Sequence, residues 1–324
     1  MHVTMDSETH LAPMPPADPV ANPVAACPAV SVITPFLDAA DFLEEAIFSV
    51  QSQTLSTWEL LLIDDGSTDG SSALARDYAA RFPGQIRYFE HAGHGNLGKS
   101  VSRNLGVTHS RGTYLTFLDA DDVLLPHKLE HQTNLLQRHP QAGMVYGTTE
   151  YWVSWDHSRG RWRRDRRGKL GVETGHLYSL STLLTTWLRK PGVVPCLCAA
   201  VARTDLVRRV GAFDESIQDL YEDQIFRVKM LMAASVYVEA GCGERYRQHS
   251  RSSSARAIAA GRYHPVRANP ARLAYLQWLE QYLKAQDALA GEPARALRAA
   301  LRPYRHPGFY RALYPFIALA ARLR

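Results

Sequence analysis

Short apolar runs alternate with helical patterns over the first part of the chain. Four short, largely apolar runs, the first of them rich in β-branched residues, predict strands over 30–34, 60–63, 86–90 and 113–118. Between them, apolar residues recur at helical spacing over 41–53, 69–82 and 99–109, and Asp41 and Asp69 are placed to cap the first two of these helices. This alternation predicts an α/β fold with a Rossmann-like, mostly parallel sheet flanked by helices.

The pattern changes toward both ends of the chain. Residues 1–28 are rich in Pro and Ala and predict a disordered tail. After residue 118 the elements are mixed: a helix that follows Pro126, strands at 143–147, 196–202 and 236–239, and a helix over 223–234. From about residue 265 the chain is helical and rich in Ala, Leu and Arg, with breaks expected at Pro293, Pro303, Pro307 and Pro315. We therefore expect a tail (1–28), a main domain (29–254) and a basic helical extension (255–324).

Composition excludes several classes of protein. Apolar residues make up 46% of the 324 positions, which is enough for a core, yet no run of about 18 apolar residues predicts a membrane-spanning helix. The start of the chain lacks the basic and apolar regions of a secretory signal. The four cysteines form no disulfide or zinc framework, which favours a reducing, cytoplasmic setting.

Charge is unevenly distributed along the chain. Residues 1–150 contain 8 Lys and Arg against 18 Asp and Glu, whereas residues 251–324 contain 13 against 3. The middle third is basic because of Arg159–Lys169. RNA binding with stacking on Trp162 is one interpretation of this run, but we favour a solvated hairpin or loop near the acceptor side, where it would meet phosphate on a lipid carrier. Because the front half is acidic, we expect no nucleic-acid partner.

Polar residues gather where the predicted strands end. The first strand runs into Thr34, Pro35 and Phe36, the second into Asp64 and Asp65, and the fourth into Asp119–Asp122. The carboxyl ends of parallel strands share one edge, where ligands of such sheets bind. Carboxylates gathered there suit Mg²⁺ or Mn²⁺ and a nucleotide diphosphate. The alternative is structural: a capped helix after Asp119–Asp122, and a turn at Asp64 and Asp65 capped by Asp69.

A second motif competes for the phosphate-binding role. Gly93–Ser100 (GHGNLGKS) satisfies the P-loop pattern and lies between a predicted strand and a predicted helix. A P-loop normally follows the first strand of its domain, whereas this segment follows the third. A nucleotide hydrolase or kinase that uses Gly93–Ser100 is therefore the alternative function. The structural alternative is that Lys99 is simply a solvated residue early in a helix.

Six segments in order resemble glycosyltransferase family 2, which has the GT-A fold. They are VSVITPF, WELLLIDDGSTDGS, NLGKSVSRNLGVTHSRGTYLTFLDADD, Val210–Glu215, Glu222-Asp223 and Tyr246–Ser250. The resemblance covers about residues 29–254. It implies a nucleotide-sugar-binding half (29–142) and an acceptor-binding half (143–254).

The resemblance also implies roles for matching residues. The nucleotide sugar would contact a set of residues around the strand ends: Thr34, Pro35, Phe36, Asp38, Asp64, Asp65, Arg103, Asp119 and Ala120. Asp121, with Asp119, would bind the metal ion, and His249 would complete that site. Asp223 would be the general base, although Glu222-Asp223 as a helix N-cap is the structural alternative. Where the family often has Pro-x-Tyr-Asn, this chain has Pro-Phe-Leu-Asp, so Phe36 would have to supply the aromatic ring beside the base.

The sequence thus predicts a metal-dependent, inverting glycosyltransferase of the hexosyltransferase type. The donor would be a nucleotide diphosphate sugar, with a UDP-sugar favoured, and the acceptor a hydroxyl of a glycan, a lipid-linked or a small molecule. A catalytically inactive GT-A-like scaffold is a further alternative, against which the joint presence of Asp119, Asp121 and Asp223 argues. Residues 308–324, aromatic and apolar with flanking arginines, would either pack as a helix or bind the inner face of the membrane peripherally.

Overall fold

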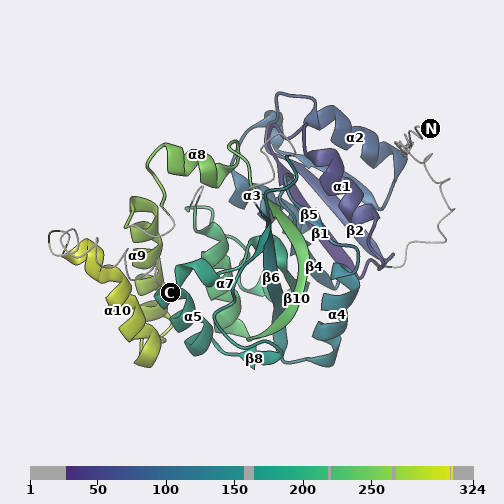
Figure 1. The fold of residues 1–324 in the computed structure, drawn as a ribbon. Helices are drawn as coiled ribbons and strands as arrows, with labels where there is room; N and C mark the ends of the chain where they lie inside the picture. Colours follow the sequence, from purple (N-terminus) through teal and green to yellow (C-terminus); the bar gives the residue numbers. More distant parts are fainter. Residues whose placement is uncertain (1–26, 157–163, 218–219, 265–267, 307, 309–324) are drawn as a thin grey trace, which may run out of the picture.

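A single mixed sheet organises the molecule (Figure 1). The computed structural model describes residues 27–156, 164–217, 220–264, 268–306 and 308. In this part of the chain the strands are β1 (Val30–Phe36), β2 (Trp58–Asp64), β3 (Ile86–Glu90), β4 (Tyr114–Phe117), β5 (Val123–Leu124), β6 (Ala142–Trp152), β7 (Arg166–Arg167), β8 (His176–Tyr178), β9 (Ala200–Arg203) and β10 (Ser235–Arg247). Their order is β3-β2-β1-β4-β9-β6-β10-β5, with β7 beside β6 and β8 beside β10.

The first four strands of this order are parallel, as their alternation with helices predicts. Val32 of β1 lies opposite Leu60 of β2 on one side and Thr116 of β4 on the other. Beyond β4 the pairing is mixed: β9 runs antiparallel to β4 and β6, β10 runs parallel to β6, and β5 closes the edge antiparallel to β10. The short strand β5 follows the acidic run at 119–122 directly, so it brings the end of β10 to the carboxyl edge of β4.

Helices cover both faces of the sheet. The α-helices are α1 (Leu43–Gln51), α2 (Ser71–Arg81), α3 (Lys99–His109), α4 (Lys128–Arg138), α5 (Leu180–Arg189), α6 (Thr204–Arg209), α7 (Glu222–Ala233), α8 (Ser253–Ala259), α9 (Pro270–Ala285) and α10 (Gly291–Arg305). Buried side chains of α1, α2 and α4 form one apolar cluster with the sheet, and those of α3, α5, α6 and α7 form another with the opposite face.

Helix α3 lies close against β1 because Gly106 has no side chain. A Cβ atom at Gly106 would lie 2.4 Å from Cγ2 of Ile33, well inside van der Waals contact. This close approach holds the amino end of α3, and with it Arg103, over the edge where the strands end.

The predicted helix caps are placed differently in the structure. Phe42 is the N-cap of α1 and makes no side-chain cap bond, while the Asp41 carboxylate pairs with Arg251. Gly70 is the N-cap of α2, and Asp69 instead accepts hydrogen bonds from the backbone N–H groups of Ala40 and Ser71. Asp69 thus ties together the loops that follow β1 and β2.

The carboxyl-terminal helices pack on α5 and α7 through a third apolar cluster. Leu184, Ile225, Leu276 and Leu297 are buried there. The expected breaks at Pro293 and Pro303 are wrong, since α10 runs through both. Pro293 lies in the first turn, where no intrahelical N–H bond is lost, and Pro303 lies in the last turn. No helix in the described ranges is long and apolar enough to cross a bilayer.

Some predictions concern residues that the structure does not describe. They are the tail up to residue 26, the first part of the basic run Arg159–Lys169, Pro307, Pro315 and the segment 309–324.

Candidate functional site

The loops that follow β1 and β2 are bound to each other at the carboxyl edge of the sheet. Asp38, whose φ of 48° is left-handed, accepts a hydrogen bond of 2.7 Å from the N–H of Thr68. The N–H of Asp65 donates to the carbonyl of Phe36 at 2.9 Å. The Asp38 carboxylate therefore connects the loop after β1 to the loop after β2 at the carboxyl edge of the sheet.

Asp64 and Asp65 are both buried and hydrogen-bonded within the protein. Asp64 accepts bonds from the Ser67 N–H (2.8 Å), the Ser72 hydroxyl (2.5 Å) and the Tyr88 hydroxyl (2.9 Å). Burial and the bonds to Glu90 and Asp64 raise the pKa of Tyr88, so it stays a donor. The Asp64 carboxylate therefore holds the loop after β2 through these three bonds.

The P-loop alternative fails on the geometry of Asp65. Its Oδ1 atom accepts the N–H groups of Leu97 at 2.8 Å and Gly98 at 3.0 Å. In a P-loop, backbone N–H groups of this kind would point at phosphate oxygens. Here a carboxylate of the protein already holds them, and a phosphate placed there would be repelled by it.

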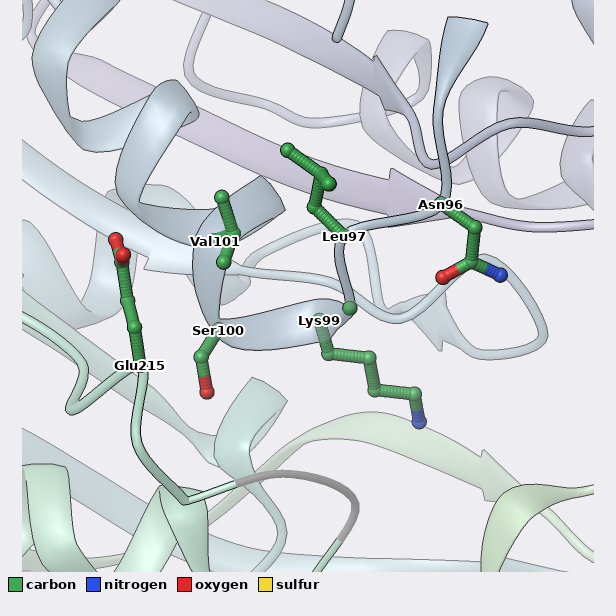
Figure 2. A pocket seen from close by; sticks show the side chains of 7 residues that line it. Asn96, Leu97, Lys99, Ser100, Val101 and Glu215 are labelled. Carbon is green, nitrogen blue, oxygen red and sulfur yellow. The ribbon is translucent and has the colours of Figure 1, made fainter.

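The segment nevertheless borders a hollow of about 150 Å³. Asn96–Val101 and Glu215 line it. Figure 2 shows Lys99 and Glu215 on opposite sides, with Ser100 between them. Lys99 lies near enough to Asp119 to help lower the pKa of that carboxyl.

One group of three potential metal ligands occurs in the described residues, and it does not suit a cation. Ligand atoms of Asp64, Glu90 and His94 lie within 4.8 Å of one another. The two nitrogens of His94 contact the Ser67 carbonyl (2.7 Å) and Glu90 (3.0 Å). These two acceptors raise the pKa of His94. An imidazolium that donates through both nitrogens has no lone pair for a metal ion.

Arg103 joins the edge of the sheet to the start of α7. Its guanidinium, 1% exposed, donates to Asp119 at 2.8 Å and to Glu222 at 3.1 Å, and it lies 5.2 Å from the centre of the Phe213 ring. Burial alone would raise the pKa of Asp119, but the charges of Arg103 and Lys99 outweigh it and the pKa is lowered. Asp119 therefore stays ionised, as a partner of Arg103.

Asp223 lies at the amino end of α7 and is held by the helix itself. Tyr221 precedes α7 with a left-handed φ of 70°, and no side chain caps the helix, so the capping interpretation of Glu222-Asp223 is wrong. Instead, the Asp223 carboxylate accepts a bond of 2.5 Å from Arg227 one turn later. Arg227 is buried and also donates to the Pro195 carbonyl at 2.8 Å. The Asp223 side chain keeps 27% exposure, so it remains open to a ligand.

Asp121 and His249 meet across the sheet edge. Nε2 of His249 lies 2.9 Å from Oδ2 of Asp121, and the imidazole packs against the rings of Phe42 and Trp155. Adjacent ligands of an octahedral Mg²⁺ ion are separated by about 3 Å, so this pair has the spacing of two metal ligands. Nδ1 of His249 is buried without a hydrogen-bond partner in the described structure. Asp119 does not join them in a group within 4.8 Å, so two of the three predicted metal ligands are brought together.

Asp122 is buried and is hydrogen-bonded to the backbone of β10. Its Oδ1 accepts the N–H of Arg247 at 2.9 Å, and Cys198 Sγ lies 3.6 Å from its Oδ2. Burial, then the neighbouring charges of Asp121, Cys196 and Asp119, raises its pKa well above the usual value. Asp122 thus fixes β10 beside the acidic run.

The remaining predicted donor-site residues, from the first strand and from the run after β4, are buried. Thr34, Phe36 and Ala120 have little exposed surface, and the Thr34 hydroxyl is buried without a partner in the described part. The Phe36 ring is 3% exposed and lies 6.5 Å from the Tyr88 ring within the core. It therefore offers no open face to a nucleobase. Pro35 of β1 lies opposite Ile63 of β2 and continues the strand toward the edge.

Sequence reasoning missed two arginines of this region. Arg227 orients Asp223, and Arg247 donates to the Asp121 carbonyl at 2.7 Å. The Arg247 guanidinium lies between 4.4 and 5.2 Å from three ring centres, those of Phe42, Trp152 and Trp155. The i, i+4 spacing of Asp223 and Arg227 on a predicted helix was a signal for the first, and the second lies in the segment Tyr246–Ser250 that resembles the family.

A family model and several known proteins match this chain. The family model described as glycosyl transferase family 2 matches residues 31–210. A relative from Rickettsia typhi, described as an uncharacterized glycosyltransferase, is 29% identical over 65% of this chain and 61% of its own length. The chain spans less than two thirds of the curated relatives it matches, and a Rickettsia bellii relative is covered over only 31%.

Solved structures share the fold. S. aureus TarS 1–349 in complex with UDP-GlcNAc superimposes with a TM-score of 0.56 at 18% identity, over 69% of this chain and 60% of that one. The mannosyltransferase PcManGT from Pyrobaculum calidifontis, in complex with GDP-Man and Mn²⁺, gives a TM-score of 0.55 at 18% identity, over 94% and 83% of the two chains. The predicted α/β, GT-A type fold with carboxyl-terminal helices is confirmed.

Proposed function

Because the chain belongs to glycosyltransferase family 2, we propose that it moves a hexosyl group from a nucleotide diphosphate sugar to a hydroxyl of its acceptor, with inversion at the anomeric carbon. The observation that carries this proposal is the double ion pair of Arg103 with Asp119 and Glu222. It fixes the start of α7, where Asp223 lies, against the edge of the sheet where nucleotides bind in α/β folds. The donor side and the base are thereby parts of one site.

Donor binding is proposed for the residues around this edge. Residues 29–142 would bind the nucleotide sugar and residues 143–254 the acceptor. The structural neighbours hold UDP-GlcNAc and GDP-Man, which supports a nucleotide-sugar donor of either base. Of these, we propose a UDP-sugar. We propose that the exposed Asp38 contacts the donor, whereas Asp64, Asp65, Arg103 and Phe36 are buried and would act by shaping the loops and the core beneath it.

We propose that Asp121 and His249 hold Mg²⁺ or Mn²⁺. Their 2.9 Å separation suits two adjacent ligands, and carboxylate with imidazole is a donor set that Mn²⁺ accepts. A bound ion would neutralise charge on the leaving diphosphate. Arg247, through the carbonyl of Asp121, fixes the main chain of the acidic run at this point.

Asp223 would accept the proton of the acceptor hydroxyl. Its carboxylate has one oxygen bound by Arg227, which fixes the side chain, and enough exposure to meet an acceptor. A general base within hydrogen-bond reach typically contributes about 10²–10⁴-fold in rate. Direct attack by the acceptor oxygen on the face opposite the diphosphate inverts the anomeric configuration. The hydroxyl would belong to a glycan, a lipid-linked sugar or a small acceptor.

A donor panel tests this proposal. The full chain is incubated with Mn²⁺ or Mg²⁺ and UDP-, GDP- and dTDP-sugars, and nucleotide release is followed with and without acceptors. We expect release with one nucleotide class, its loss in Asp121→Asn, and no change in Asp77→Asn, an exposed control on α2. Proton NMR of the product reads the anomeric configuration. Release from no donor, or retention of configuration, would contradict the corresponding part of the proposal.

A further inference from the structure

Two cysteines lie side by side in the segment that leads into β9. Sγ of Cys196 is 2.9 Å from Sγ of Cys198, and both are free thiols. A disulfide bond is about 2.05 Å long, so a shift of roughly 0.9 Å would join the two sulfurs. Cys196 is partly exposed, whereas Cys198 is buried. The pair therefore offers one sulfur to an external reagent and holds the second within reach of the first.

Polar partners hold both thiols in place. Thr149 Oγ1 lies 3.2 Å from Cys196 Sγ and accepts the Cys196 N–H at 3.2 Å. Cys198 Sγ lies 3.6 Å from Oδ2 of Asp122, which fits a thiol that donates to a carboxylate. The contact with Cys196, burial and the nearby carboxylates of Asp122 and Glu244 raise the pKa of Cys198 well above its usual value, so this sulfur keeps its proton. Cys198 is thus a hydrogen-bond donor to the acidic run after β4.

Asp122 links Cys198 to the proposed metal site. Its other oxygen, Oδ1, accepts the N–H of Arg247 at 2.9 Å, and Nε of Arg247 donates to the carbonyl of Asp121 at 2.7 Å. Asp121 in turn lies 2.9 Å from His249. A buried acceptor that loses a donor costs free energy, so a change at Cys198 acts on Asp122 and on the residues bonded to it.

Pro195 links the same segment to the candidate base. Its carbonyl accepts a bond of 2.8 Å from the buried Arg227, and Arg227 holds the carboxylate of Asp223 at 2.5 Å. The Pro195 carbonyl belongs to the peptide group of Cys196, so a shift of Cys196 toward Cys198 acts on it directly. Residues 195–198 therefore contact both the metal side and the base side of the proposed site.

We propose that Cys196 and Cys198 are a redox-sensitive pair, which a peroxide converts to a disulfide that loosens the proposed site. In the first step the Cys196 sulfur attacks one peroxide oxygen: an S–O bond forms, the O–O bond breaks, and the thiol proton leaves with the other oxygen as water. In the second step the Cys198 sulfur attacks Cys196: the S–S bond forms, the S–O bond breaks, and the Cys198 proton leaves in a second water molecule. Both sulfurs are oxidised and both peroxide oxygens are reduced.

The disulfide removes a hydrogen bond from the acidic run. Once oxidised, Cys198 has no proton to donate, so Oδ2 of Asp122 loses that donor in buried surroundings. The bond from the Arg247 N–H to the same carboxylate is the first that we expect to weaken. An effect on sugar transfer follows through Asp121 and Asp223, and this part of the inference rests on the proposed function.

Peptide mapping tests the disulfide without any substrate. The reduced full chain is treated with hydrogen peroxide, blocked with N-ethylmaleimide and digested with trypsin, which leaves both cysteines on the peptide 190–203. We expect this peptide to lose two hydrogen atoms and to add no maleimide, and dithiothreitol to reverse the change. Cys198→Ser should stop at the sulfenic acid of Cys196, which dimedone traps. Cys242→Ser, which removes another partly exposed thiol, is the control and should form the disulfide as the wild type does.

Hydrogen exchange then measures whether the disulfide loosens the edge of the sheet. The amide of Arg247 should exchange at least about tenfold faster in the oxidised chain, because a buried acceptor has lost a donor. The amide of Leu60 in β2, bonded to the Gln85 carbonyl, should exchange equally in both forms. The double variant Cys196→Ser/Cys198→Ser should not respond to peroxide. Circular dichroism melts confirm that each variant is folded.

Two outcomes would overturn the inference: peroxide yields no disulfide on the peptide 190–203, or the disulfide forms and the Arg247 amide exchanges as before. If the proposed function also holds, nucleotide release should fall at least about tenfold on oxidation and recover with dithiothreitol. Full release by the oxidised chain would contradict the switch alone. The proposed function fails separately: a disulfide with faster exchange, but no nucleotide release from any donor by the reduced chain, would leave the redox pair standing and contradict the transferase.

Discussion

Arg103 and Glu222 form a buried ion pair of 3.1 Å although 119 positions separate them in the chain. The pair joins α3, packed on β1, to the first residue of α7. Since Arg103 also binds Asp119, the same guanidinium determines the position of the acidic run and of the candidate base. The two halves of the proposed site are therefore coupled through one side chain.

Replacing Arg103 should damage both stability and activity. Arg103→Met keeps the volume but leaves Glu222 and Asp119 without their cation, so we expect a loss of about 3 kcal/mol in the free energy of unfolding. Urea denaturation measures this loss, and nucleotide release should fall in parallel. Arg76→Met breaks the exposed pair with Glu90 and should leave the free energy of unfolding nearly unchanged, because solvent screens exposed ion pairs. Similar losses in the two variants would contradict the role assigned to the buried pair.

Removing the charge of Asp223 should slow transfer more than it weakens donor binding. Asp223→Asn keeps the shape and an oxygen for Arg227 but cannot take a proton, so kcat should fall about 10²–10⁴-fold. Steady-state kinetics with the active donor measures kcat and KM separately. Asp205→Asn, exposed on α6, is the control. A rise in donor KM at unchanged kcat would instead assign Asp223 to donor binding.

Local signals in the sequence gave the framework correctly. The apolar runs at 30–34 and 60–63 lie within β1 and β2, and the helix expected over 99–109 is α3, because burial on a regular sheet imposes its period on the chain. The caps expected at Asp41 and Asp69 are wrong because of distant contacts. Asp41 pairs with Arg251 and Asp69 accepts the N–H of Ala40, neither of which a local pattern can show.

In the candidate site, too, the features that could not be predicted depend on contacts between residues far apart in the sequence. The meeting of Asp121 with His249, 128 positions apart, was anticipated only through the family resemblance. The aromatic surroundings of Arg247 were not anticipated, because β10 is far longer than the apolar run at 236–239 that predicts it. The polar end of β10, which carries Arg247, is paired with the polar end of β6. The buried role of Arg227 was not anticipated because it depends on the Pro195 carbonyl, which is distant in the sequence.

The metal proposal can be tested by comparing Asp121 and His249 with the group of Asp64, Glu90 and His94, which also combines carboxylates with a histidine. Asp121→Asn and His249→Gln should each weaken Mn²⁺ binding at least about tenfold, since each removes one of few protein ligands. Electron paramagnetic resonance of free Mn²⁺ measures binding directly, apart from catalysis. Glu90→Gln alters the group of Asp64, Glu90 and His94 and should leave Mn²⁺ affinity unchanged. Loss of affinity in Glu90→Gln with full affinity in the other two variants would move the metal to that group.

Glu59 should make the stability of the fold depend on pH. Its buried carboxylate accepts bonds from Ser31 at 2.7 Å and from the N–H of Arg111 at 2.6 Å. Burial alone would raise the pKa of Glu59, but these bonds and the Arg111 charge outweigh it, so the pKa is lowered on folding. A lowered pKa stabilises the fold above the unfolded value, about pH 4.3, and this contribution is lost as pH falls through the folded pKa.

Glu59→Gln should therefore cost about 2 kcal/mol at pH 7 by urea denaturation, and its difference from wild type should shrink below pH 4. Glu173→Gln, whose side chain is 89% exposed, should show no such difference at either pH, and a Glu59→Gln deficit that grows on acidification would contradict the sign argued here.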